Sequence, residues 1–220
     1  MTPLAPRDAY ELWAGTYPPF PHNAVMAAEQ AIVEPLLRRL SAARALDVGT
    51  GSGRYLPILV AGGARVVGVD FSMAMLRAGS TGSSFAAESA AGRVCADGRH
   101  LPFRRGAFDL INASLMTGDI ADLAAWTSEA ARVLRIGGHL VYSDFHPTWQ
   151  ERGWQRTFRD AGGVLRTIAM EPHAIDDHLD ALAASGLRVL AIREPRVTVN
   201  RRHEAVVVVF HATKEGGDLR

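Results

Sequence analysis

Short apolar runs alternate with amphipathic stretches along most of the chain, from residue 45 onward. The amphipathic stretches have apolar positions at helical spacing, whereas the short runs are rich in the β-branched residues of buried strands. Alternation of these two patterns is typical of βαβ units, which predicts an α/β protein with a doubly wound, mainly parallel sheet. The expected strands lie at residues 45–49, 65–70, 92–97, 108–114, 137–145, 186–194 and 204–212.

Helices are expected between the strands and also in front of the first one. Ser72 is a good N-cap for a helix over residues 72–79, and residues 119–135 carry a longer amphipathic pattern. Residues 24–40 give one more amphipathic helix, which we expect to pack beside the sheet as an N-terminal cap.

One segment interrupts the alternation of strands and helices. Residues 146–173 separate the fifth strand from the helix that starts at residue 174, and two alternating arms flank Gly162 and Gly163. Paired glycines can supply the positive φ of a tight turn, so this insertion is expected to contain a β-hairpin. A single domain over residues 1–220 is predicted, with cap helices at 1–43, a binding core at 44–145, a substrate-covering insertion at 146–173, and a C-terminal helix and two strands at 174–214.

Composition narrows the class of partner. The 220 residues carry 24 Lys and Arg against 23 Asp and Glu, so no strong field would attract nucleic acid or an anionic membrane. We therefore expect a small-molecule partner, no metal, and a monomer or homodimer. Cys95 is the single cysteine, no signal-peptide pattern is seen at the N-terminus, and the longest apolar run, residues 205–210, is too short to cross a bilayer. These features predict a cytoplasmic protein without a membrane span.

The first predicted strand ends in a glycine-rich loop, in the stretch "ALDVGTGSGRYL" at residues 45–56. A strand that runs through glycines into a helix places backbone N–H groups at the carboxyl edge of the sheet, where nucleotides bind in α/β folds. Gly49, Gly51 and Gly53 fall at every second position, and the dinucleotide fingerprint G-x-G-x-x-G would need glycine where Arg54 stands. The match to a dinucleotide site is imperfect.

Asp47 lies two residues before the first glycine of this loop. A carboxylate there would repel a pyrophosphate by ~1–4 kcal/mol, depending on distance and effective dielectric, and would attract a cation instead. S-adenosylmethionine carries a sulfonium and an ammonium group but no phosphate, so it fits this loop better than NAD. An NAD-type nucleotide-binding oxidoreductase stays open as the alternative.

Two further acids follow the second and third predicted strands. Asp70 can accept hydrogen bonds from both hydroxyls of an unphosphorylated ribose, and its alternative role is to cap the next helix. Asp97, with the backbone of Ala96 and Gly98, can meet an adenine edge, and its alternative role is a simple turn.

Three stretches carry a family resemblance. Residues 45–76, 96–115 and 129–145 resemble, in this order, the motifs of the class I S-adenosylmethionine-dependent methyltransferases, above all the branch with small-molecule acceptors related to quinone and biotin biosynthesis. The resemblance implies a seven-stranded sheet whose last strand inserts antiparallel, S-adenosylmethionine as cofactor and S-adenosylhomocysteine as product. The cofactor-binding residues that it implies are Asp47, Gly49, Thr50, Gly51, Gly53, Asp70, Phe71, Met75, Ala96, Asp97, Gly98, Ser114 and Tyr17.

Aromatic residues are expected to cover this site. The N-terminal segment at residues 10–19 resembles the aromatic segment that folds over the cofactor in the family, although plain helix packing is the alternative. The insertion is expected to cover an acceptor pocket, and its four arginines, Arg152, Arg156, Arg159 and Arg166, are assigned to a solvated face rather than to an acidic acceptor. The candidates for substrate binding are Tyr10, Trp13, Trp149, Trp154 and His173.

The reaction implied is an in-line displacement, in which the acceptor approaches the methyl group opposite to the departing sulfur. Positioning supplies most of such catalysis, and an oxygen acceptor is favoured by its frequency in the family. Many relatives have a histidine pair after the fourth strand, where this chain has Gly118 and Asp119. Asp119 is thus a candidate base or cation anchor, but the role of N-cap for the following helix is favoured. Asp144 and His146 are the other catalytic candidates, and a non-methylating binder or pericyclase on the same scaffold stays open.

Overall fold

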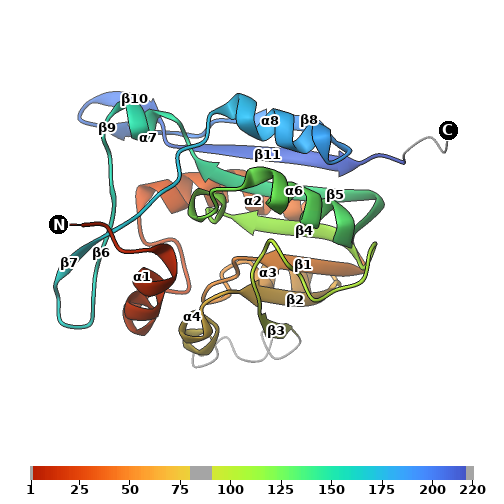
Figure 1. Cartoon of the computed structure of the whole chain (residues 1–220), viewed down its shortest axis with the longest axis horizontal. Coiled ribbons are helices and arrows are strands. Elements are labelled where there is room, and N and C mark those ends of the chain that lie inside the picture. The colour runs from red at the N-terminus through yellow and green to blue at the C-terminus, as the bar shows by residue number, and fades with distance from the viewer. Residues whose placement is uncertain (1, 80–90, 217–220) are drawn as a thin grey trace.

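A seven-stranded sheet forms the centre of the protein, in a computed structural model that describes residues 2–79 and 91–216 (Figure 1). The strand order is β3-β2-β1-β4-β5-β11-β8, and neighbouring strands are parallel except that β11 runs antiparallel to both β5 and β8. The predicted fold, with its antiparallel last strand, is confirmed. The strands of this sheet are β1 (Arg44–Val48), β2 (Arg65–Asp70), β3 (Gly92–Cys95), β4 (Phe108–Ser114), β5 (Leu134–Phe145), β8 (Leu187–Arg193) and β11 (Val207–Lys214).

Helices cover both faces of the sheet, which is why its central strands are apolar on both sides. On β11, Val209 packs in a cluster with Val33 and Leu37, whereas its neighbour Phe210 packs in a second cluster with Trp126 on the opposite face. The first face is covered by α2 (Ala24–Arg39) and α3 (Leu56–Ala61), and the second by α6 (Leu123–Val133) and α8 (Ile175–Ala184) (Figure 1).

A third, small cluster holds the N-terminal segment against the insertion. Ala9, Phe158 and Ile168 are its buried members, and the Leu4 N–H donates to the Thr167 carbonyl over 2.8 Å. The predicted hairpin is present, because two antiparallel strands flank the glycine pair. We call this unit the outer wall: α1 (Pro6–Trp13), the 3-10 turn η1 (Ala14–Thr16), β6 (Arg156–Arg159) and β7 (Leu165–Ile168).

The helix expected over residues 119–135 starts later than predicted. Its N-cap is Asp122, whose Oδ1 accepts a hydrogen bond of 2.9 Å from the Ala125 N–H. Asp119 lies in the preceding 3-10 turn η2 (Thr117–Asp119), and its carboxylate pairs with Arg156 instead. The favoured N-cap role of Asp119 is therefore wrong, since another aspartate three residues on supplies the cap.

The C-terminal segment contains two more strands than expected. An antiparallel hairpin of β9 (Arg196–Val199) and β10 (Arg202–Ala205) precedes β11, and it splits the run that was expected to be one strand over 204–212. Asn200 and Arg201 form its turn with φ of 48° and 65°. This turn lacks the Asn-Gly or Asp-Gly pair that marks such hairpins in a sequence, so the pattern gave no signal.

Candidate functional site

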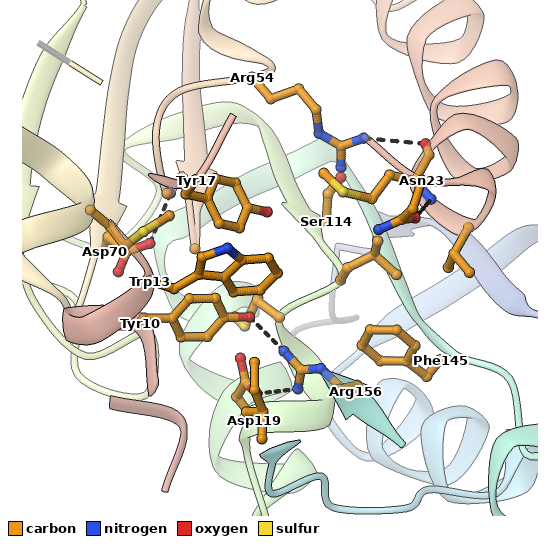
Figure 2. Close-up of a pocket in the computed structure, with 18 of the residues that line it drawn as sticks. Tyr10, Trp13, Tyr17, Asn23, Arg54, Asp70, Ser114, Asp119, Phe145 and Arg156 are labelled. Atoms are coloured by element: carbon orange, nitrogen blue, oxygen red, sulfur yellow. Dashed lines mark hydrogen bonds and ion pairs between the residues drawn. The ribbon is translucent and has the colours of Figure 1, made fainter. Parts of the chain in front are cut away.

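A cavity of about 360 Å³ opens at the carboxyl ends of the central strands, between the sheet and the outer wall (Figure 2). Its size falls within the range of roughly 300–1,000 Å³ that is usual for small-molecule sites. The expected site residues that line it are Tyr10, Trp13, Tyr17, Gly49, Gly51, Asp70, Phe71, Met75, Ser114, Asp119 and Trp149.

Backbone forms the wall of the cavity at the glycine loop. Gly49 and Gly51 have φ of 67° and 56°, in the left-handed region that favours glycine. A Cβ on Gly49 would lie 2.7 Å from the Met116 Cβ, closer than two carbon atoms can pack. The Thr50 N–H donates to the Val69 carbonyl over 2.9 Å, which ties the loop to the end of β2.

Asp47 lies behind this loop rather than on the cavity surface. Its Oδ2 accepts from the Thr50 hydroxyl and its Oδ1 from the Asn112 amide, each over 2.7 Å. Burial raises the pKa of Asp47 to about 6, although both hydrogen bonds act to lower it. Asp47 and Thr50 border a smaller cavity of about 40 Å³ beside the main one. Asp47 thus borders the small cavity and is not among the residues that line the main one.

Asp70 faces the main cavity at the end of β2 (Figure 2). Its Oδ2 accepts from the Gly51 N–H over 2.8 Å and its Oδ1 from the Ser72 N–H over 2.9 Å. Ser72 caps α4 (Met73–Ala78) through its hydroxyl, as predicted, so the alternative cap role of Asp70 falls away. Burial raises the pKa of Asp70 to about 6. Each carboxylate oxygen keeps a lone pair for a further donor from the cavity.

Aromatic rings of the outer wall lie over the cavity (Figure 2). Trp13 stacks on Phe158 with ring centroids 4.9 Å apart, and Tyr17 meets Trp13 edge-on at 4.7 Å. Tyr10 contacts Phe71 edge-on at 6.2 Å, which links α1 to the loop after β2. The N-terminal aromatic segment therefore joins the insertion and the sheet.

A buried ion pair of Asp119 and Arg156 closes one side of the cavity. Arg156 places a guanidinium nitrogen 2.5 Å from the Asp119 Oδ1, and its other terminal nitrogen donates to the Tyr10 hydroxyl over 2.5 Å. The side chains of Arg156 and Asp119 are only 7% and 8% exposed, and the guanidinium lies 4.8 Å from the centre of the Phe145 ring. Burial raises the pKa of Asp119, and the Arg156 charge opposes that rise.

The solvated face predicted for the hairpin arginines is wrong for Arg156. Residues along β6 alternate, so Arg156 and Phe158 point inward while Thr157 and Arg159 point to solvent. The burial of Arg156 could have been predicted from the sequence, because residues two positions apart in a strand lie on the same face and Phe158 is apolar. Arg159 is exposed, as expected.

A second buried charge went unnoticed in the sequence. Glu29 of α2 is fully buried, and its Oε2 accepts from the Tyr55 hydroxyl over 2.7 Å and pairs with Arg54 at 2.9 Å. Its Oε1 accepts from the Ser143 hydroxyl over 3.0 Å. Arg54, the residue in place of the third dinucleotide glycine, lines the cavity. The sequence did contain a signal for this burial: Glu29 stands four positions before Val33 and therefore lies on the apolar face of the helix.

His146 does not line the cavity. Its Nδ1 lies 2.7 Å from the Thr148 hydroxyl and its Nε2 lies 3.0 Å from the Glu194 carboxylate. Both ring nitrogens are therefore engaged away from the cavity, and His146 has no place in the function proposed below.

Asp144 is buried and does not line the main cavity. Its Oδ1 accepts from the Phe145 N–H over 2.7 Å, and its Oδ2 lies 3.2 Å from the Nε2 of His178, a fully buried residue of α8. This carboxylate is part of the support of the site and not of its surface.

Several expected residues lie outside the cavity lining. Asp97 is 40% exposed and pairs with Arg99 at 2.7 Å. His173 bonds to the Ile120 carbonyl at 2.8 Å, and Trp154 meets Trp149 edge-on with ring centroids 5.7 Å apart. The expected residues that the structure does not bring to the main cavity are Asp47, Thr50, Gly53, Ala96, Asp97, Gly98, Asp144, His146, Trp154 and His173.

Over residues 2–79 and 91–216, no group of three or more His, Cys, Asp or Glu side chains is arranged to hold a metal ion. Within the same ranges, no helix is long and apolar enough to span a bilayer.

The fold, and a cavity at the carboxyl edge of the sheet, are typical of α/β proteins that bind nucleotides. Residues 46–142 match a protein family described as a methyltransferase domain. This match agrees with the resemblance of the motifs to the class I S-adenosylmethionine-dependent methyltransferases.

Among curated relatives, the chain is 37% identical over 111 residues to a demethylmenaquinone methyltransferase from Corynebacterium urealyticum. This alignment covers 49% of the chain and 45% of that relative, so the chain spans less than half of the relative's length.

Solved structures share the fold over more of the chain. An S-adenosylmethionine-dependent methyltransferase from Mesorhizobium loti superposes with a TM-score of 0.65 at 22% identity, over 82% of this chain and 96% of that one. The [4+2]-cyclase SpnF superposes with a TM-score of 0.68 at 16% identity, over 99% and 98% of the two chains. Because one fold hosts both a methyltransferase and a cyclase, the activity has to be argued from the site.

Proposed function

We propose that the protein transfers a methyl group from S-adenosylmethionine to a small-molecule acceptor, at oxygen, by in-line displacement. The observation that carries the proposal is the pair of buried acids, Asp47 and Asp70, on either side of the glycine loop. S-adenosylmethionine is also the cofactor that the resemblance of the motifs implies.

The charges around the loop favour a cation without phosphate. A diphosphate bound at Gly49 and Gly51 would face the negative fields of both acids when these are ionised, whereas a sulfonium would be stabilised by them. In this arrangement Asp70 accepts from the ribose hydroxyls, while Phe71 and Met75 contact the adenine. The methionine part then lies along the loop, and its methyl group points toward the end of the cavity that Asp119 and Arg156 close.

In-line transfer needs the acceptor oxygen, the methyl carbon and the sulfur on one line, with water excluded. Trp13 of the outer wall, together with Tyr17 and Trp149, lines the cavity with aromatic surface that would help to exclude water. A small-molecule acceptor is also supported by the Corynebacterium relative, which is named for a quinone precursor. A cytoplasmic location and a monomeric or homodimeric state stay predictions from the sequence.

Thermal shift assays with S-adenosylhomocysteine and with NAD test the cofactor. We expect S-adenosylhomocysteine to raise the melting temperature and NAD to leave it unchanged. A shift with NAD alone would favour the oxidoreductase alternative. Transfer of label from methyl-labelled S-adenosylmethionine then separates a methyltransferase from a cyclase or binder, which would hold the cofactor without consuming it.

A further inference from the structure

We propose that the Asp119–Arg156 pair is the acceptor subsite, and that the acceptor is a neutral, flat hydroxyarene whose hydroxyl donates its proton to Asp119. This inference rests on the proposed function and adds the substrate class and the base. Asp119 and Arg156 both line the cavity but come from different parts of the fold. Asp119 lies in the loop after β4, and Arg156 lies in the outer wall.

The pair forms the side of the cavity that lies below Tyr10 in Figure 2. Figure 2 shows Asp119 and Arg156 pointing toward one another below Tyr10, with Asp70 and Arg54 at other sides of the cavity. The Asp119 carboxylate pairs with Arg156 through Oδ1 and also accepts a hydrogen bond from the Tyr10 hydroxyl. A carboxylate has lone pairs on both oxygens, so Asp119 can accept from an acceptor hydroxyl while it holds the guanidinium.

Charge balance argues for a neutral acceptor. Among the cavity-lining residues that the structure describes, the cations are Arg54 and Arg156, and each already faces a buried acid, at 2.9 Å from Glu29 and 2.5 Å from Asp119. An acceptor carboxylate would be desolvated next to Asp119 without a free cation to compensate it, which is costly in a buried site. A neutral hydroxyl meets no such penalty.

The walls around the pair argue for a flat ring. The Phe145 ring lies 4.8 Å from the Arg156 guanidinium and meets the Trp149 ring edge-on at 4.9 Å. The Trp149 indole N–H donates to the Val206 carbonyl over 2.9 Å, so it has no donor left for a ligand and contributes only apolar ring surface to the cavity. Leu115 and Ile168 add aliphatic surface. Aromatic ligands gain most from such surroundings.

The proposed methyl transfer needs only the acceptor, the cofactor, Asp119 and Arg156. The acceptor O–H bond breaks and its proton passes to Asp119, while an oxygen electron pair forms the new bond to the methyl carbon. The methyl–sulfur bond breaks, its electrons stay on sulfur, and the sulfonium becomes the neutral thioether of S-adenosylhomocysteine. Arg156 donates to the oxygen as negative charge develops on it. Asp119 returns its proton to solvent when the products leave.

Arg156 also keeps the base ionised. Burial raises the pKa of Asp119, and the guanidinium opposes this rise, so removal of the cation would leave the carboxyl protonated at higher pH. The other titratable groups around Asp119 are Tyr10 of α1, whose hydroxyl donates to the carboxylate, Asp144 of β5 and Asp70 of β2.

The acceptor class is tested with matched pairs of ring compounds in the presence of saturating cofactor. Phenol, catechol, 1-naphthol and 2-naphthol are compared with benzoate, salicylate, 1-naphthoate and 2-naphthoate by calorimetry with S-adenosylhomocysteine and by transfer of labelled methyl groups. We expect methylation of at least one neutral hydroxyarene and binding of its carboxylate partner at least tenfold weaker.

Tighter binding or faster methylation of the carboxylates overturns the inference, as does failure of both sets while S-adenosylhomocysteine binds. Failure to bind S-adenosylhomocysteine instead removes the proposed function.

The base is tested with Asp119→Asn, which keeps the size of the side chain and its contact with Arg156. We expect turnover of the best hydroxyarene to fall ~100-fold or more, with S-adenosylhomocysteine affinity within about twofold of wild type, and the acid limb of the kcat/KM pH profile to vanish. Asp180→Asn on the exposed face of α8 is the matched control and should change neither.

If Asp119→Asn does not fold, Arg156→Lys replaces it, with kcat lowered about tenfold and KM changed little. Wild-type turnover in either folded variant, or an intact acid limb in Asp119→Asn, contradicts the role.

Discussion

The two walls of the cavity are built on different principles. The sheet wall is formed largely by backbone: the glycine loop is tied to β2 by the peptide hydrogen bond between Thr50 and Val69 and by the Asp70 carboxylate, and it rests on the two large clusters of the central sheet. The outer wall rests on a cluster with three buried residues and is tied to the sheet by the Asp119–Arg156–Tyr10 contacts. Side chains and charge therefore hold the acceptor end, whereas chain geometry holds the cofactor end.

The largest effect is expected on the outer wall. Arg156→Ala leaves Asp119 buried without its cation, which typically costs about 3–5 kcal/mol of unfolding free energy. Arg159→Ala, in the same hairpin but exposed, should cost less than about 1 kcal/mol. Urea unfolding of both variants measures the difference. Equal and small losses would mean that the ion pair does not hold the outer wall.

The next effect is expected at the glycine loop. Gly49→Ala forces a Cβ against Met116, 2.7 Å away, in addition to the strain of a positive φ. We expect a loss of ~2–4 kcal/mol in S-adenosylhomocysteine binding or in stability. Gly63→Ala is the matched control, because its φ of 84° brings the same strain into open space, and it should leave binding unchanged. Wild-type affinity and stability in Gly49→Ala would show that backbone geometry does not limit this wall.

A smaller loss is expected for Asp70→Ala. Calorimetry should show S-adenosylhomocysteine binding weakened by about 1–3 kcal/mol, because the ribose hydroxyls would lose their buried acceptor. Asp180→Ala should leave the affinity unchanged. Unaltered affinity in Asp70→Ala would contradict the ribose assignment.

The smallest expected effect is a dependence of binding on pH. Burial raises the pKa of Asp70 to about 6, above its ordinary value of 3.8, so its burial costs stability as pH rises through that window. Ribose hydroxyls donate to the ionised form, so S-adenosylhomocysteine affinity should fall about tenfold from pH 7 to pH 5 as the carboxylate is protonated. Asp70→Asn should flatten this profile, although burial also raises the pKa of Asp47, to about 6, and that of Asp119. An equally steep profile in Asp70→Asn would assign the pH dependence to another group.

The sheet wall was largely predictable from the sequence, and the outer wall was not. Strands, glycine loop and Asp70 are local patterns, because Gly49, Gly51 and Asp70 stand at fixed distances from the strand ends that position them. Asp47 was found for the same reason, but its orientation away from the cavity depends on Asn112, a residue of another strand.

The acceptor end depends on contacts between distant parts of the chain. Arg156 meets Asp119 and Tyr10 across separations of 37 and 146 residues, which no local pattern encodes. Four hairpin arginines were indistinguishable by composition, and only the phase of β6 separates Arg156 from Arg159. For Asp119, the cap rule was sound but applied to the wrong aspartate, since Asp122 performs that role.

A crystal structure with S-adenosylhomocysteine tests the central claim most directly, namely that the two ends of this cavity hold cofactor and acceptor. The account predicts ribose hydroxyls within hydrogen-bonding distance of Asp70 and the thioether sulfur facing the end that Asp119 and Arg156 close. A sulfur that points away from that end, or a nucleoside bound outside the cavity, would contradict it.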